Sequence, residues 1–266
     1  MFRSIELNYS QEFDVNKFLL VGESWVSSAT HYKGWDQFAS TTFHLGAEDL
    51  LKAVNSDDIA ITYMPAHEAA EKFPSTLSEL QKYQGIIFSD IGSNTILLHP
   101  KVWIDGEVFP NRLDLVREFV ELGGAFMMVG GYLSFQGING SARFRGTSIE
   151  EILPVNILPY DDRIEIPQGF SIEVDRSAES HSILEGLQGK WPPLLGINEV
   201  TIKDGANQIL QIPTNLGSHP LLVEWQYSKG KTIVWTSDIG PHWVSKEFLD
   251  WEGYSKLWNQ IFNWMG

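Results

Sequence analysis

The stretch Gly123-Gly-Ala-Phe-Met-Met-Val-Gly-Gly-Tyr132 sets five apolar residues between two pairs of glycines. An uninterrupted apolar run of this length is typical of a strand that is buried on both faces, as in a parallel sheet covered by helices. The first glycine pair is suited to end a preceding helix in a left-handed conformation. The second pair leaves room for a sharp turn directly after the strand. This stretch therefore predicts a helix, a central buried strand and a tight turn in that order.

Segments of the same two kinds alternate on either side of this stretch. Apolar runs that indicate buried strands lie at 17–22, 59–64, 85–89, 221–225 and 232–235. Apolar residues at helical spacing lie at 47–54, 67–83, 111–122 and 248–265, and Pro74 marks a break in the second of these. Alternation with short links predicts right-handed crossovers and an α/β fold. We expect a flavodoxin-like, doubly wound parallel sheet.

The second half of the chain differs in character between about residues 155 and 220. Short β-rich segments such as 164–166, 170–174, 199–203 and 208–212 replace the alternation there. The length of 266 residues fits one large domain. We therefore expect a single domain over 1–266 that carries a β-rich insertion at about 155–220.

The composition excludes several classes of function. The formal charge of −15 disfavours nonspecific nucleic-acid binding and binding to an anionic membrane surface, both of which need a cationic footprint. The sequence contains 0 cysteines, so the chain cannot supply a thiol nucleophile, a disulfide or a thiolate metal ligand. The first residues do not read as a signal peptide, and no apolar run approaches the roughly 20 residues of a membrane span. A cytoplasmic location is the expectation.

Polar, glycine-rich and aromatic residues follow each predicted strand. In open α/β sheets ligands bind beyond the carboxyl ends of the strands, so these residues are expected to converge on one edge. The ligand-binding candidates chosen on this basis are Ser24, Trp25, His31, Asp36, Asp90, Gly92, Gly131 and Trp243.

The residues at these strand ends also resemble a known family. The chain is similar to the class I glutamine amidotransferase-like superfamily, in particular to its uncharacterised cytoplasmic branch. The similarity is carried by Val21-Gly-Glu-Ser-Trp25, Ser89-Asp-Ile-Gly92, 123–132, Ile152-Leu-Pro-Val155 and Ser237-Asp-Ile-Gly-Pro-His-Trp243. It covers nearly the whole chain.

The resemblance implies a flavodoxin-like fold. It also shows where this chain departs from the pattern of the family. Enzymes of the superfamily carry a cysteine nucleophile on a glycine-flanked turn between strand and helix, activated by a histidine that an acid orients. Tyr132 stands at the cysteine position of this elbow. A phenol, with a reference pKa near ~10, is a poor replacement for a thiol near ~8.5. Glutamine hydrolysis is therefore not expected.

Other groups near the elbow could still carry chemistry. The catalytic candidates are His242, Asp238, Glu23, Tyr132 and Ser134. Asp238 lies four residues before His242, and a carboxylate that orients an imidazole is the usual arrangement for a base. Ser134 is an alternative nucleophile, although its surroundings are not those of a G-x-S-x-G elbow. A buried histidine that hydrogen-bonds its own turn is the structural alternative for His242.

The sequence also offers residues for a metal site and for a sugar-binding site. Glu23, His31, Asp36, Asp90, Asp238 and His242 offer ligand types that suit Mn, Mg or Zn, but they show no tight spacing such as H-E-x-x-H, so we assign no metal and no cofactor. Tryptophans beside carboxylates are a common means of holding sugars.

We expect a cysteine-less amidotransferase-like protein that binds a small polar metabolite such as a carbohydrate, with hydrolase-type chemistry through His242. The alternative is a non-catalytic binding or oligomerisation module that forms homo-oligomers.

Overall fold

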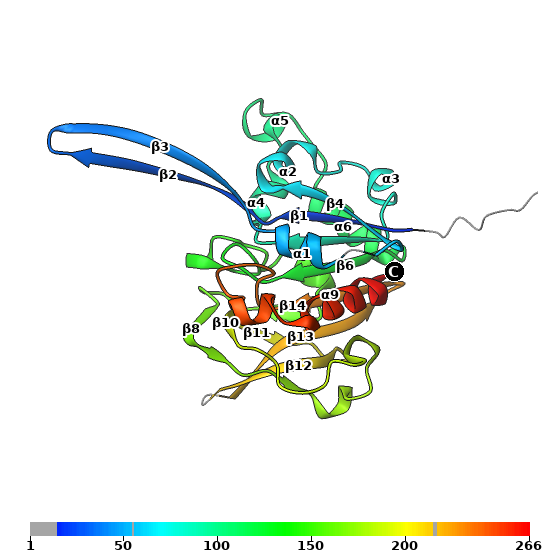
Figure 1. Ribbon diagram of the computed structural model, residues 1–266. Coiled ribbons are helices and arrows are strands. Elements are labelled where there is room, and N and C mark those ends of the chain that lie inside the picture. Colours follow the sequence, from blue (N-terminus) through cyan, green and yellow to red (C-terminus); the bar gives the residue numbers. More distant parts are fainter. Residues whose placement is uncertain (1–14, 55, 215–216) are drawn as a thin grey trace, which may run out of the picture.

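The computed structural model describes residues 15–54, 56–214 and 217–266, and its centre is a sheet of eight strands in the order β4-β1-β5-β6-β14-β13-β12-β9 (Figure 1). The parallel part comprises β1 (Asn16–Gly22), β4 (Ile59–Pro65), β5 (Gly85–Ser89), β6 (Ala125–Val129) and β14 (Gly230–Trp235). The antiparallel part comprises β13 (Gly217–Tyr227), β12 (Asn207–Thr214) and β9 (Glu173–Val174). The predicted α/β fold around a parallel sheet is confirmed.

Helices cover both faces of this sheet because its central strands are apolar on both sides. Phe18 and Leu20 of β1 join one core cluster, whereas Leu19 and Val21 join the other. The first cluster is covered by α1 (Glu48–Ala53), α8 (Lys246–Leu249) and α9 (Glu252–Met265). The second is covered by α2 (Ala66–Lys72), α3 (Leu77–Leu80), α4 (Ser93–Leu97), α6 (Arg112–Glu121) and α7 (Ser148–Ile152). The short helix α5 (Pro100–Trp103) follows α4.

Two of the predicted helices are divided in the structure. The segment 67–83 forms α2 and α3, with Pro74 between them and a capping box in which Thr76 and Glu79 satisfy each other's backbone N–H groups. The C-terminal segment forms α8 and α9, the latter 14 residues long. Among the described residues no helix is long and apolar enough to cross a membrane.

The segment between α7 and β14 is rich in strands. Besides β9, β12 and β13 it contains two small antiparallel sheets, in which β7 (Val155–Ile157) pairs with β11 (Val200–Ile202) and β8 (Arg163–Phe170) pairs with β10 (Leu194–Asn198). Short 3-10 turns lie at Ile138–Gly140, Arg176–Ala178 and Ser182–Leu184. β8 and β10 lie close to the carboxyl end of the sheet through the contacts described below.

The segment directly after β1 differs most from the prediction. From their position after the first strand, Ser24, Trp25, His31 and Asp36 are expected to converge on the sheet edge. The segment instead forms β2 (Ser24–Lys33), which pairs with β3 (Asp36–Leu45) in an antiparallel ribbon. Figure 1 shows this ribbon extending away from the rest of the molecule. We call residues 24–45 the arm.

Arg112 is a buried cation that joins α6 to the elements beside it. Its side chain is fully buried, and its guanidinium donates to the backbone carbonyls of Ile96, Ala69, Phe73, Ala70 and Thr95. Burial lowers the pKa of Arg112 to about 10. The charge remains at neutral pH, and it satisfies carbonyl groups at the ends of α2 and α4 that would otherwise lack partners.

Replacing Arg112 is expected to destabilise the protein strongly. Arg112→Ala leaves several buried carbonyls without donors, and we expect a loss of about 3 kcal/mol or more in the free energy of unfolding, measured by urea denaturation. The matched control is Arg117→Ala on the same helix, whose ion pairs with Glu121 and Glu151 are partly exposed and contribute about 0–1 kcal/mol. Equal losses for the two variants would contradict this account.

Candidate functional site

Glu23 directly follows β1 and has a left-handed backbone conformation, with φ of 47°. Its N–H donates to the carbonyl of Ser89 at 2.7 Å, and its own carbonyl accepts from the N–H of Gly46 and from the hydroxyl of Tyr63, both at 2.8 Å. These bonds offset the cost of about 1 to 3 kcal/mol that a non-glycine residue pays for such a conformation. The turn directs the Glu23 carboxyl into the protein, where it is buried and accepts from Ser89 Oγ at 2.5 Å.

Asp90 follows the neighbouring strand β5 and is also left-handed, with φ of 43°. Its Oδ1 accepts from the N–H of Leu133 at 2.6 Å, and its own N–H donates to Ser134 Oγ at 3.2 Å. Gly131, after β6, has φ of 148°, and a Cβ built there would lie 2.8 Å from Asp90 Oδ1. The carboxyl of Asp90 therefore occupies the space that a side chain at position 131 would need.

Asp238 and His242 come from the segment after β14. Asp238 is buried, and its Oδ1 accepts from the N–H groups of Ile239 at 2.6 Å and Gly240 at 3.3 Å. Its Oδ2 lies 3.8 Å from Nδ1 of His242, whose side chain is 38% exposed. The buried carboxyl of Asp238 therefore lies next to the imidazole of His242, which solvent and small molecules can reach.

Three carboxyls near one another in a buried place disfavour full ionisation. Burial raises the pKa of Glu23 well above its usual range, and the charges of Asp238 and Asp90 raise it further. Burial likewise raises the pKa of Asp238, with a further contribution from Asp90. Because the negative charge of each of these carboxyls disfavours ionisation of the others, their titrations are linked. Glu23 and Asp238 therefore form a carboxyl pair that retains a proton to higher pH than either group would alone.

Aromatic rings lie around the exposed imidazole. His242 stacks on Tyr132, with ring centroids 5.6 Å apart and planes inclined by 21°, and it lies 5.0 Å from the ring of Trp25 at the base of the arm. Trp25 in turn stacks on His44 at 4.9 Å. The site thus combines carboxyl groups, one imidazole and flat aromatic surfaces.

The hydroxyl and the ring of Tyr132 are both engaged by neighbouring side chains, which does not suit a nucleophile. Its hydroxyl donates to Glu165 Oε1 at 2.9 Å, which also accepts from Nε1 of Trp243 at 3.1 Å. The guanidinium of Arg163 lies 5.1 Å from the centre of the Tyr132 ring. Burial, together with the hydrogen bond to Glu165, raises the pKa of Tyr132, so the phenol stays neutral.

The structure brings together the predicted residues that follow the strand ends. Contacts or electrostatic interactions connect Glu23, Asp90, Gly131, Tyr132, Asp238, His242, Trp25 and Trp243. Trp243 is buried, and its ring packs against the ring of Tyr132.

Other predicted residues have structural roles at or near the same edge. Ser24 Oγ accepts from the N–H of Ala66 at the start of α2. Ser134 is buried and accepts from Asp90, which does not fit a nucleophile presented to a ligand. Gly92 precedes α4 and lies against the backbone of Ala142.

His31 and Asp36 are placed away from the carboxyl groups. His31 pairs with Phe38 in the outer half of the arm, stacks on its ring at 4.6 Å and hydrogen-bonds Ser40. Asp36 pairs with Lys33 beside the turn at the far end of the arm. They are candidates because they follow the first strand, and the continuous pairing of the arm carries them away from the edge at which that strand ends.

Several residues that shape the site were not among the candidates. Ser89 binds the Glu23 carboxyl, and Glu165 and Arg163 of β8 hold Tyr132. Asn198 of β10 accepts from the N–H of Gly131 at 2.9 Å and donates to its carbonyl at 3.2 Å. Ser89 directly precedes Asp90 and could have been found from the strand end. The residues of β8 and β10 come from a distant segment, and nothing in their local sequence points to this edge.

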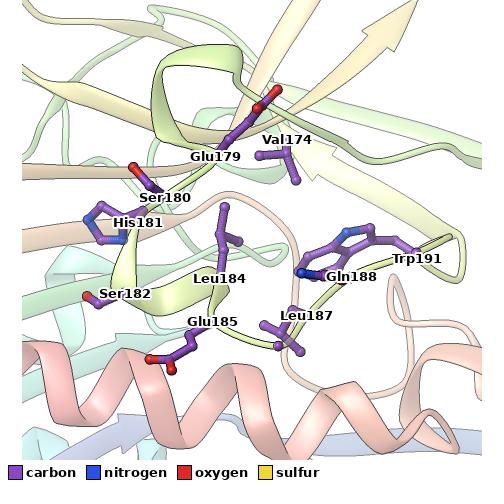
Figure 2. Close-up of a pocket in the computed structure, with 12 residues that line it drawn as sticks. Val174, Glu179, Ser180, His181, Ser182, Leu184, Glu185, Leu187, Gln188 and Trp191 are labelled. Atoms are coloured by element: carbon purple, nitrogen blue, oxygen red, sulfur yellow. The ribbon is translucent and has the colours of Figure 1, made fainter.

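Neither a metal centre among the described residues nor the cavity around residues 174–191 contributes to this site. Within the described residues no group of three or more His, Cys, Asp or Glu side chains is placed to hold a metal ion. A cavity of about 610 Å³ lies elsewhere, around residues 174–191, with Leu184, Leu187 and Trp191 among its lining (Figure 2). None of the predicted site residues lines it.

Comparison with known proteins places the whole described body of the chain in one family. The model of a family described as "putative glutamine amidotransferase" matches residues 17–266. Cytoplasmic protein STM3548 from Salmonella typhimurium is 38% identical, with a TM-score of 0.87 over 93% of this chain and 98% of that one. Cytoplasmic protein STM1381 from Salmonella typhimurium LT2 is 39% identical, with a TM-score of 0.87 over 94% of this chain and 99% of that one.

A more distant structure shares the fold alone. A ThuA-like protein from Bacteroides uniformis is 14% identical, with a TM-score of 0.53 over 97% of this chain and 94% of that one. Among curated proteins no match was found.

The carboxyl pair predicts a specific dependence of stability on pH. The folded-state pKa of Glu23 lies above the unfolded value of 4.5, so the folded state binds the proton more tightly. The resulting stabilisation is complete below the unfolded pKa and is lost as pH rises toward the folded pKa. Over that window the free energy of unfolding should fall by up to about 1.4 kcal/mol per pH unit for one proton.

Glu23→Gln, which keeps the shape but has no proton to lose, should flatten this decline and raise the stability near neutral pH. Urea denaturation at several pH values between 4 and 8 measures both effects. Glu107→Gln removes an exposed carboxyl and serves as the control. Parallel pH profiles for wild type and Glu23→Gln would show that the pKa of Glu23 does not rise on folding.

Proposed function

The chain belongs to the family described as putative glutamine amidotransferases, and from that premise we propose that it binds a small polar metabolite, neutral or cationic, at the carboxyl ends of β1, β5 and β14. The observation that carries the proposal is the pair of left-handed residues Glu23 and Asp90 at the ends of two adjacent strands. Strained conformations of non-glycine residues cluster at functional sites, where the surrounding structure holds them.

The strand order supports this location. Numbered along the chain, the parallel strands β1, β4, β5, β6 and β14 lie in the order 2-1-3-4-5, which is the flavodoxin-like order. In such sheets ligands bind where the order reverses, beyond the carboxyl ends of the first and third strands. These strands are β1 and β5, which Glu23 and Asp90 follow directly.

The chemistry of the site favours a ligand rich in hydroxyl or amino groups. Carboxyl groups accept hydrogen bonds from such groups, and a protonated member of the Glu23–Asp238 pair donates one. Tyr132, Trp25 and His242 offer flat faces on which a sugar ring or similar ligand could stack. The formal charge of −15 opposes the approach of an anion.

Thiol-dependent amide hydrolysis is not part of the proposal. The sequence has 0 cysteines, and the space beside the turn after β6 holds Asp90 instead of a nucleophile. Any turnover would use acid–base chemistry of the hydrolase type. In that scheme His242 takes a proton from a bound water or hydroxyl, and Asp238 orients the imidazole. The Nδ1–Oδ2 distance of 3.8 Å would have to shorten when ligand binds.

The location in the cell is proposed from the relatives. Two proteins of 38% and 39% identity are described as cytoplasmic. We propose that this chain works in the same compartment.

A thermal-shift screen tests the binding site. Neutral sugars, amino sugars, polyols and sugar acids are tested on wild type, His242→Ala and Asp90→Asn. A ligand at about 100 times its dissociation constant stabilises by about 2.7 kcal/mol, which corresponds to roughly 5 to 10 °C in Tm for a chain of this size. Both variants should lose most of the shift, because His242→Ala removes the imidazole and Asp90→Asn replaces a carboxyl oxygen, which accepts hydrogen bonds, by an amide NH2 group, which donates them.

His67→Ala is the matched control, because it removes an exposed histidine of α2 that lies outside the carboxyl cluster. Neutral or amino sugars should give larger shifts than sugar acids. Equal shifts in wild type and His242→Ala for every compound that binds, or no binding by any compound, would overturn the proposed site.

A further inference from the structure

The arm is an isolated two-stranded ribbon. β2 and β3 are 10 residues each, pair along their full length from Ser24 opposite Leu45 to Lys33 opposite Asp36, and form a sheet of their own. The turn is Gly34-Trp35, with Gly34 at φ of 64°, as a two-residue hairpin turn requires at its first position. At about 3.3 Å per residue the ribbon is about 33 Å long. Figure 1 shows it standing clear of the helices and the central sheet.

Both edges of this ribbon are unpaired and lack the usual protection. Natural edge strands are shielded by charges, prolines or bulges, which prevent pairing with other chains. Residues 24–32 and 37–45 contain no proline, lysine, arginine, aspartate or glutamate, and the register runs without a bulge. The charged pair Lys33 and Asp36 stands only beside the turn. The edges are therefore open to a further strand.

The side chains of the arm are suited to close contact with another protein surface. Its middle consists of small residues, Ser27-Ser-Ala-Thr30 on one strand and Ala39-Ser-Thr-Thr42 on the other. Nearer the body, Val26 and Phe43 lie opposite each other and are 56% and 48% exposed. A flat centre with an apolar patch at one end is suited to burial against protein and costly to leave in water.

An isolated hairpin is also marginally stable in water, because two strands bury too little surface to offset the entropy of ordering them. Three or more strands, or packing against a further element, are needed. Among the described residues the arm has such contacts only near its base, where Phe43 meets His67 and Trp25 meets His242. The outer part of the arm therefore requires a partner.

The charge distribution and the size of the arm favour a second copy as that partner. The chain carries a formal charge of −15, so most approaches between copies are repulsive. The arm carries one Lys and one Asp and is neutral, which makes it a surface through which two copies can meet. A 10-residue edge strand of one arm can pair along its whole length with the same strand of a second arm.

We propose that residues 24–45 are a dimerisation arm, and that the ribbons of two copies pair edge to edge in one antiparallel four-stranded sheet about a two-fold axis. In this arrangement the same strand of each copy supplies the new ladder, as an isologous interface requires. The backbone groups of one edge gain partners, and the middle residues of the two arms meet at the axis.

Charges placed in the middle of the arm test this proposal. Ser28 and Thr41 lie opposite each other and are exposed, so Ser28→Lys with Thr41→Lys leaves the body untouched. Wild type should sediment as a dimer or a larger even assembly. The double variant should shift toward monomer, with its dissociation constant raised about tenfold or more, because like charges meet at the axis.

The control addresses the other exposed apolar patch. Trp103 and Val108, on α5 and the loop after it, are 73% and 102% exposed. Trp103→Lys with Val108→Lys adds the same number of charges and should leave the assembly intact. Circular dichroism and Tm confirm folding of both variants.

The absence of native cysteine permits a direct second test. Ser28→Cys and Thr41→Cys each introduce the sole thiol of the chain, and a short bismaleimide should link two copies through at least one of them, according to which edge pairs. Val108→Cys should not link. A monomeric wild type at concentrations up to several hundred micromolar, an assembly that only the Trp103/Val108 variant disrupts, or failure of both arm thiols to link would overturn the proposal.

Discussion

The turn at Glu23 fixes both the candidate site and the arm. The hydrogen bond from its N–H to the carbonyl of Ser89 joins the ends of two adjacent parallel strands, and the left-handed backbone that follows sends the carboxyl inward and the chain outward. Tyr63 and Gly46 hold the carbonyl of the same residue, so the conformation is fixed from three sides. One residue thereby supplies a buried acid to the sheet edge and starts β2.

Trp25 connects the candidate site with the arm. Trp25, two residues after the turn, contacts His242 of the site while its strand continues into the arm. Any partner that orders the arm would also fix one aromatic wall of the site. Residues 23–25 therefore connect the proposed site directly with the base of the arm.

Much of the fold follows from local sequence, because the signals that decide it are local. The apolar runs at 17–22, 85–89 and 125–129 are strands buried on both faces, and Pro74 divides a helix as expected. The acids and the imidazole at the strand ends were identified because parallel strands bring their carboxyl ends to one edge. The arm was missed because its Ser- and Thr-rich centre lacks the apolar alternation of a half-buried strand. Such a pattern arises when neither face is covered by the chain's own residues.

The roles of individual side chains could not be foreseen in the same way. Ser134 and Ser24 look reactive in sequence, yet their hydroxyls accept backbone N–H groups, and Tyr132 is held by Glu165 from a strand more than thirty positions away. The account depends on the Glu23–Asp238 pair holding a proton to higher pH than a carboxyl group in water does. Carboxyl-selective ¹³C NMR measures this directly. The account predicts that one resonance of the pair, absent in Glu23→Gln, keeps the shift of a protonated carboxyl to higher pH than the exposed carboxyls do, and resonances that titrate together with the exposed carboxyls would contradict it.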